Sequence, residues 1–146
     1  DAGTPTISDP GVLLVDKVRN ELPDVEVIAL PGASALVTAL SASGISSATF
    51  TFYGFLPHKK GRETLFTTIK ESTHTAVFYE SVHRIEKTLK TLAEMIPETR
   101  QIVIARELTK LHEEVVRGTP QMVMDYFNKK KDHIRGEFVV IVEGNK

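Results

Sequence analysis

Apolar residues along this chain follow two spacings, one typical of helices and one typical of strands. Residues 12–22 repeat apolar side chains every three or four positions, which predicts a helix. Residues 25–30 form a short apolar run that predicts a strand, and residues 34–43 again have helical spacing. The second helix should end at Gly44, because glycine readily adopts the left-handed conformation that closes a helix.

The same alternation continues through the rest of the chain. We expect a linker at residues 45–49 and a domain boundary there, with residues 1–45 ending a first domain and residues 46–146 forming a second α/β domain. The second domain should contain strands at 50–55, 75–79, 101–105 and 138–142, an extended segment near 114–116, and helices at 62–71, 82–96 and 120–130. This pattern predicts a mostly parallel or mixed sheet flanked by helices, with ligands at the carboxyl ends of the strands.

Composition narrows the classes of function. The chain has 146 residues, enough to bury a core, and a formal net charge of −1, so any nucleic-acid-binding surface must be a local basic patch. It has no cysteine, and its histidines do not have the spacing of a metal site, so we expect no disulfide, thiol nucleophile or metal. No apolar run is long enough to span a bilayer and no signal peptide is visible, which favours a cytoplasmic protein without a membrane partner.

The first eleven residues are rich in turn-forming types. The string Asp-Ala-Gly-Thr-Pro-Thr-Ile-Ser-Asp-Pro-Gly has two glycines, two prolines and two aspartates. Glycine permits close backbone approach and proline fixes turns, so this loop is suited to facing a ligand. Asp9 is expected to cap the following helix, with Pro10 at its first position. On composition alone, an ordinary connecting loop is the more frequent case.

This loop and four later segments together resemble the tetrapyrrole (corrin/porphyrin) methylase family, in its ribosomal-RNA-modifying branch. The segments occur in family order: 1–11, 30–35 with 43–44, 53–57, 78–85, and 105–119 with 136–138. The strings Tyr-Glu-Ser-Val-His-Arg at 79–84 and Arg-Glu-Leu-Thr-Lys at 106–110 resemble that branch specifically, although Val82 stands where proline is usual. The resemblance implies a two-domain α/β fold and a homodimer. It also implies that residues 1–146 lack the N-terminal part of the first domain and are inactive alone.

The resemblance further implies S-adenosylmethionine as the cofactor, held in a cleft between the two domains. The residues expected to bind it are Asp1, Ala2, Gly3, Ile7, Ser34, Ala35, Gly54, Phe55, Leu56 and Tyr79. Asp1 would attract the ammonium group of the methionine part, and Ser34 and Ala35 would begin a helix whose free N–H groups favour polar ligands. The alternatives are plain core positions for Phe55 and Leu56.

The implied reaction is methyl transfer to the 2'-hydroxyl of a cytidine in small-subunit ribosomal RNA. The residues expected to act in catalysis are Glu80, Arg106, Glu107, Lys110 and His112. Glu107 or His112 would accept the hydroxyl proton, while Arg106 and Lys110 would hold phosphates or lower the pKa of that hydroxyl. Structural ion pairs, Glu80 with Arg84 and Glu107 with Lys110, are the alternatives.

The RNA itself is expected to contact Lys59, Lys60, Arg62 and Arg84, with the lysines at 129–131 as a weaker candidate. A solvated surface is the alternative for each of these basic runs. Two other functions stay open. One is a tetrapyrrole C-methyltransferase of the same fold, which needs an apolar trough, and the other is a module that binds a nucleotide or RNA without catalysis.

Overall fold

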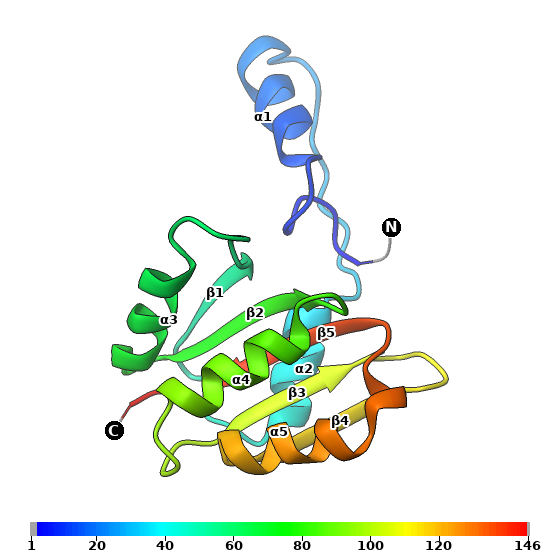
Figure 1. Cartoon of the computed structure of the whole chain (residues 1–146). Helices are drawn as coiled ribbons and strands as arrows, with labels where there is room; N and C mark the ends of the chain where they lie inside the picture. Colours follow the sequence, from blue (N-terminus) through cyan, green and yellow to red (C-terminus); the bar gives the residue numbers. More distant parts are fainter. Residues whose placement is uncertain (1–2, 146) are drawn as a thin grey trace. The chain divides into compact units, whose positions relative to one another are not determined.

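The structure is a computed structural model that describes residues 3–145 (Figure 1). The chain divides into two compact units, Asp1–Ala35 and Leu36–Lys146. The division falls ten residues before the boundary expected from the linker at 45–49, because the helix at residues 35–43 packs against the sheet of the second unit.

The first unit consists of a turn-rich loop and one helix, α1 (Val12–Glu21). Asp9 does not cap this helix as predicted: its Oδ2 accepts hydrogen bonds from the backbone N–H groups of Thr6 and Gly11, at 3.2 and 2.9 Å, and so closes the preceding turn. Gly11 occupies the cap position instead, without a side-chain hydrogen bond. The carboxylate of Asp9 therefore organises the loop rather than the helix.

The strand predicted at residues 25–30 is not formed, and this prediction is wrong. A strand requires a neighbour that takes up its backbone N–H and C=O groups, and the described part of the first unit, residues 3–35, contains no strand to pair with. Val25, Ile28 and Leu30 are consequently exposed, Leu30 to 77%. The apolar run is present, but within this unit it has no partner.

The second unit contains a five-stranded mixed sheet, as predicted. Its strands are β1 (Phe50–Phe55), β2 (Thr75–Ser81), β3 (Ile102–Arg106), β4 (Glu114–Gly118) and β5 (Glu137–Val142). They lie in the order β1-β2-β5-β3-β4. β1 and β2 are parallel, and β5 is antiparallel to both β2 and β3, so β1, β2 and β3 all end at the same edge of the sheet. We call this the carboxyl edge.

Helices cover both faces of this sheet (Figure 1). One face packs against α2 (Ala35–Ser43), and the other against α3 (Arg62–Glu71), α4 (Ile85–Met95) and α5 (Pro120–Lys129), which is followed by the short helix η1 (Lys131–His133). β5 is apolar from Phe138 to Val142 because both of its faces are covered. Phe138, Val140 and Val142 face the three-helix layer, while Val139 and Ile141 face α2.

Two predicted helix ends are confirmed. Gly44, after α2, has a φ of +63°, and the Thr119 hydroxyl caps α5 by accepting a hydrogen bond from the Met122 N–H at 3.3 Å. Pro120 follows as the first residue of α5. None of the helices within residues 3–145 combines the length and the apolar character needed to cross a membrane.

Candidate functional site

The carboxyl edge of the second unit gathers most of the predicted site residues. Phe55 ends β1 and Leu56 follows it, the end of β2 carries Tyr79 and Glu80, and the segment after β3 runs from Glu107 to Glu113. The N-terminal ends of β4 and β5 lie at the same edge because both strands run antiparallel to β3. Segments far apart in the sequence therefore meet at one edge, as the alternation of strands and helices predicts.

Four predicted cofactor residues, Gly3, Ile7, Ser34 and Ala35, belong to the first unit. Gly3 has a φ of +101°, which favours glycine, and the next residue, Thr4, donates its backbone N–H to the Ala33 carbonyl at 2.8 Å. The first loop and the turn at residues 31–35 are thus joined within this unit. Asp1 and Ala2, also predicted to bind the cofactor, lie outside the described residues.

The end of β1 is irregular and partly open. Gly54 has a φ of +60°, and the pairing of β1 with β2 shifts register between Phe52 and Phe55. Phe55 is 56% exposed, whereas Leu56 is 2% exposed and belongs to the hydrophobic core. Leu56 is therefore a core residue, which is the alternative that its residue type left open. The Phe55 ring faces outward at the carboxyl edge.

Three aromatic rings meet beside this bulge. The Tyr79 ring makes edge contacts with Phe52 and Phe55, with centroids 4.9 and 5.4 Å apart. Burial raises the pKa of the Tyr79 phenol, and the nearby backbone N–H of Leu36 opposes that rise. Tyr79 stays protonated at neutral pH, so its hydroxyl remains a hydrogen-bond donor.

Glu80 lies at the end of β2 and is buried, with no exposed side-chain surface. Its carboxylate accepts hydrogen bonds from Arg62 Nη2 at 3.1 Å and from the Thr88 hydroxyl at 2.7 Å, and Arg84 Nε is 2.8 Å away. The Ser81 backbone N–H adds a fourth donor at 2.9 Å. The Glu80–Arg84 ion pair, raised as an alternative to a catalytic role, is present. We call Glu80, Arg62, Arg84 and Thr88 the Glu80 cluster.

Arg106, a predicted catalytic residue, is buried at the end of β3 and faces the protein. Its Nε lies 3.1 Å from Glu114 Oε2, and its Nη1 donates to the His133 carbonyl at 2.6 Å. Glu114 also accepts from Tyr126 and from His133 Nδ1. Burial raises the pKa of the Glu114 carboxyl, but these hydrogen bonds and the charge of Arg106 outweigh it, so the pKa lies below its usual value. These contacts indicate a structural role for Arg106.

Glu107 and Lys110 form the pair raised as an alternative to catalysis. Lys110 Nζ lies 2.9 Å from Glu107 Oε1 and 2.9 Å from Glu137 Oε2. Glu107 Oε1 also accepts the Glu137 backbone N–H at 3.0 Å. The hydrogen bond from Lys110 is the main reason that the pKa of Glu107 is lowered, so its carboxylate is a weak base at neutral pH.

The backbone of this segment is strained. Glu107 and Thr109 have φ values of +48° and +65°, in the left-handed region that non-glycine residues seldom adopt. Gly136 is needed beside it, because a Cβ there would overlap the Glu107 carboxylate. The result is a loop of fixed shape that leaves Leu111 92% exposed and His112 exposed, with no hydrogen bond from His112 to any described residue. Strain of this kind clusters at functional loops.

The predicted RNA-binding residues divide into two groups. Lys59 and Lys60 are exposed in the turn before α3 and form no ion pair with any described residue, whereas Arg62 and Arg84 point into the Glu80 cluster. A groove of about 800 Å³ between α3 and α4 is lined by both lysines and by Lys87 of α4. The structure thus places the free positive charges along this groove.

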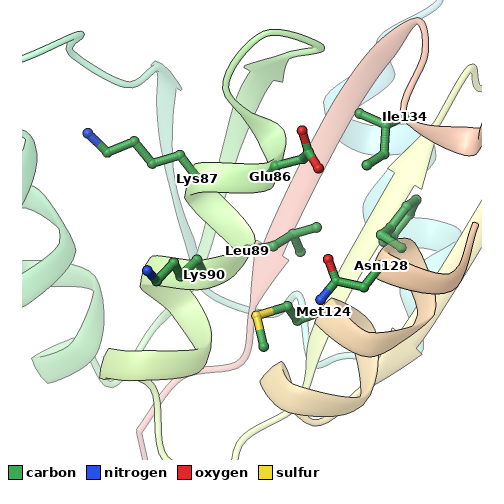
Figure 2. A pocket seen from close by; sticks show the side chains of 8 residues that line it. Glu86, Lys87, Leu89, Lys90, Met124, Asn128 and Ile134 are labelled. Atoms are coloured by element: carbon green, nitrogen blue, oxygen red, sulfur yellow. The ribbon is translucent and has the colours of Figure 1, made fainter. Parts of the chain in front are cut away.

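The lysines at 129–131 are mostly engaged within the protein. Lys131 pairs with Glu86, and Lys130 Nζ bonds to the Tyr126 hydroxyl at 2.8 Å while lying 4.5 Å from the centre of its ring. A second groove, of about 460 Å³, separates α4 from α5 (Figure 2). Leu89 and Met124 face this groove, while Lys87 and Lys90 point away from it (Figure 2). None of the predicted site residues lines it.

Comparison with known proteins establishes the family. The sequence profile of the Tetrapyrrole (Corrin/Porphyrin) Methylases matches residues 1–123, which is most of the chain. The chain belongs to the tetrapyrrole methylase family.

Relatives within this family are similar along the entire chain. The ribosomal RNA small subunit methyltransferase I of Buchnera aphidicola subsp. Acyrthosiphon pisum is 44% identical over 147 residues, covering 100% of this chain and 51% of its own length. Enzymes of the same name from Haemophilus influenzae and Bacillus subtilis are 46% and 45% identical, covering 99% of this chain and 50% and 48% of their own lengths. The chain spans about half the length of the curated relatives it matches.

Solved structures of tetrapyrrole methylases share the fold. The methyltransferase CobJ superposes with a TM-score of 0.67 at 19% identity, covering 99% of this chain and 62% of CobJ. Uroporphyrin-III C-methyl transferase from Thermus thermophilus, complexed with S-adenosylhomocysteine, gives a TM-score of 0.61 at 18% identity, covering 97% of this chain and 62% of that enzyme. At these identities the likeness concerns the fold alone.

Sequence reasoning missed several members of this site. Glu114, His133 and Gly136 hold the loops after β3 and before β5, and Thr88 completes the Glu80 cluster. Glu114 had a visible signal, because a carboxylate at the start of a predicted strand must find partners if it is buried. Gly136 lies in a segment that resembles the family, but its contact with Glu107 had no signal in the sequence, and neither had Thr88, since their neighbours come from distant parts of the chain.

Proposed function

We propose that this chain is part of an S-adenosylmethionine-dependent methyltransferase that methylates the 2'-hydroxyl of a cytidine in small-subunit ribosomal RNA. The observation that carries the proposal is the identity of 44% to 46%, over essentially the whole chain, with enzymes named ribosomal RNA small subunit methyltransferase I. The gathering of residues 79–84 and 106–113 at one sheet edge supports it, because these strings resemble the RNA-modifying branch.

The residues at the carboxyl edge fit part of an S-adenosylmethionine site. A nucleoside ligand needs backbone polar groups beside an apolar surface, and Gly54, with its positive φ, and the exposed Phe55 ring offer both. Tyr79 adds a protonated hydroxyl on the adjacent strand. Gly3, Ile7, Ser34 and Ala35, in the first unit, stay proposed cofactor residues on the family resemblance. When bound, the cofactor supplies a methyl group on an activated sulfonium.

His112 is our candidate for the group that accepts the proton of the ribose hydroxyl. It is exposed on the strained loop, and histidine is the side chain that most often acts as a general base. Glu107 is engaged by Lys110 and by the Glu137 N–H, which supports a role in holding the loop. Glu80 and Arg106 are buried and fully paired, which supports positioning roles for both.

RNA would contact the groove between α3 and α4. Lys59, Lys60 and Lys87 line it and have no ion-pair partner among residues 3–145, so their charges are free for phosphates. Arg62 and Arg84 are not proposed to contact RNA phosphates, because their guanidinium groups are bound to Glu80. The lysines at 129–131 are weaker candidates because two of them are engaged.

The proposal includes a homodimer in the cytoplasm, where ribosomal RNA is modified, and a functional division near residue 45. Its support is the family resemblance. Sedimentation of the purified protein at two concentrations measures its oligomeric state, and a single monomeric species would remove the dimer from the proposal.

A methyl-transfer assay tests the function. The purified full-length protein that contains this chain is incubated with radiolabelled S-adenosylmethionine and one acceptor at a time: small-subunit RNA, assembled small subunits or uroporphyrinogen. We expect label in RNA or subunits, at a cytidine whose 3'-phosphodiester resists alkaline cleavage. Label in the tetrapyrrole alone would establish the C-methyltransferase alternative, and cofactor binding without transfer to any acceptor would establish a non-catalytic module.

A further inference from the structure

The Glu80 cluster has an unusual balance of charge for a buried site. One carboxylate, with no exposed side-chain surface, faces two guanidinium groups whose side chains are 8% and 16% exposed. Buried charges persist only when their hydrogen-bonding groups are satisfied. The second guanidinium positive charge is not neutralised by Glu80, so the other partners of Arg62 and Arg84 matter.

Besides the hydroxyls of Thr88 and Ser81, those partners are two consecutive carbonyl oxygens of the loop after β1. Arg84 Nη1 donates to the Leu56 carbonyl at 2.7 Å, and Arg62 Nη1 donates to the Pro57 carbonyl at 3.2 Å. Each arginine therefore uses one nitrogen for Glu80 and another for the loop. A guanidinium has several donors in a fixed plane and can bridge two acceptors in this way, whereas a lysine amine is a single point charge.

The loop needs such support because the sheet does not provide it. The register of β1 with β2 shifts after Phe52, where Gly54 has a positive φ, and the last paired residue is Phe55, opposite Tyr79. Leu56 and Pro57 follow the strand and are not paired with β2. Pro57 has no N–H to donate. The Arg62 and Arg84 bonds hold the two carbonyls next to Phe55, which is itself exposed.

We propose that Glu80, Arg62 and Arg84 form a clamp that positions the loop from Gly54 to Pro57, with Glu80 a positioning residue that orients both guanidinium groups. The clamp acts on the surface that would receive the adenosine part of the cofactor, so its effect on binding rests on the proposed function. Its effect on the loop itself does not.

The variant Arg84→Lys tests the clamp without removing its positive charge. Lysine keeps the positive charge beside Glu80 but lacks the planar fork of donors with which Arg84 contacts Glu80 through Nε and the Leu56 carbonyl through Nη1. We expect amide hydrogen exchange at residues 54–60 to accelerate about tenfold, as loss of one charge-assisted hydrogen bond implies, and trypsin to cleave faster after Lys59 and Lys60. Exchange in β3 and β5 should change much less.

Arg100→Lys is the matched control. Arg100 is also buried and also donates to backbone carbonyls, those of Lys70, Ile69 and Glu143, but it lies just before β3, at the opposite edge of the sheet. This variant should lower overall stability while leaving exchange at residues 54–60 close to that of the unsubstituted protein. Equal loosening of that loop by both variants would overturn the clamp, because it would indicate a general loss of stability.

Cofactor affinity separates the clamp from the proposed function. If both are correct, Arg84→Lys weakens S-adenosylhomocysteine binding about tenfold and Arg100→Lys leaves it nearly unchanged. These affinities are measured in the full-length protein that contains this chain. If the unsubstituted full-length protein does not bind S-adenosylhomocysteine but Arg84→Lys still loosens the loop selectively, the proposed function fails and the clamp stands. If exchange at residues 54–60 is unchanged in both Arg84→Lys and Glu80→Gln, the clamp is wrong.

Discussion

Two helices with similar leucine content show how differently the two units of this chain treat apolar side chains. In α1 of the first unit, Leu13 and Leu14 are 73% and 67% exposed, and none of the ten residues of the helix is buried. In α4 of the second unit, Leu89 and Leu92 are 2% and 0% exposed. The helical pattern is present in both, but only α4 has a sheet face in its own unit to pack against. Local sequence determines the helix, and the surroundings determine its contribution to stability.

Two apolar segments, one in each unit, differ even more. The apolar runs at residues 25–30 and 137–142 look alike in sequence, yet the second forms β5, paired on both sides, and the first forms no strand. A helix satisfies its own backbone hydrogen bonds, whereas a strand needs neighbours. The second unit therefore behaves as an independent core, and the first unit has none within residues 3–35.

The largest expected effect compares one leucine from each helix. Leu92→Ala should lower the free energy of unfolding of the second unit by about 2–5 kcal/mol, because it leaves a cavity in the core. Leu13→Ala should change it by less than about 0.5 kcal/mol, because that side chain is exposed. Urea denaturation followed by circular dichroism measures both. Similar losses for the two variants would mean that α1 is buried in solution and would break the comparison.

A second test concerns the strained loop of the second unit. His112→Asn should lower the single-turnover rate of RNA methylation about 100-fold, since it removes the proposed proton acceptor, while leaving RNA affinity unchanged. His83→Asn, a change of another exposed histidine, is the control and should have little effect. If His112→Asn retains the full rate, the base must be sought elsewhere on the carboxyl edge.

A third test uses pH. Because the pKa of Glu114 is lowered in the folded state, its ionised form stabilises the fold above the carboxyl's usual pKa, and this stability is lost as the pH falls through the folded pKa. Glu114→Gln should therefore lower stability by about 1–3 kcal/mol at pH 7 and flatten its decline below the usual carboxyl range. Glu63→Gln, at an exposed position, should leave the curve unchanged. Identical acid denaturation of Glu114→Gln and the unsubstituted protein would exclude this role.

The smallest expected effect compares lysines of the two units. Lys59→Gln and Lys60→Gln should each reduce the slope of log RNA affinity against log salt concentration by about one unit, because each phosphate contact releases counterions. Lys17→Gln, in α1, should leave the slope unchanged. Binding titrations at several salt concentrations measure this. An equal reduction by Lys17→Gln would show that RNA also contacts the first unit.

Much of the second unit was predictable from sequence, for reasons that particular residues show. Phe138 to Val142 form an unbroken apolar run because alternate side chains face α2 and the opposite layer, and Thr119-Pro120 marks the start of α5 through its cap. Such signals are local. The predicted domain boundary also rested on a local signal, the linker at residues 45–49.

The candidate site was less predictable because its electrostatics are not local. Arg62 and Arg84 look like a basic surface in sequence, yet both point at the buried Glu80, which is 18 positions after the first and four before the second. Arg106 is likewise bound to Glu114 and to the carbonyl of His133, and so does not face solvent. Sequence spacing alone cannot distinguish a charge that faces solvent from one that faces a buried partner.

The most direct test of the account is a hydrogen-exchange footprint of the protein with S-adenosylhomocysteine and small-subunit RNA. We predict that S-adenosylhomocysteine slows exchange at residues 54–56 and 79–81, and that adding RNA extends the protection to residues 58–64 and 107–113. Protection confined to the groove between α4 and α5, or no protection at the carboxyl edge in the presence of bound ligand, would contradict the account.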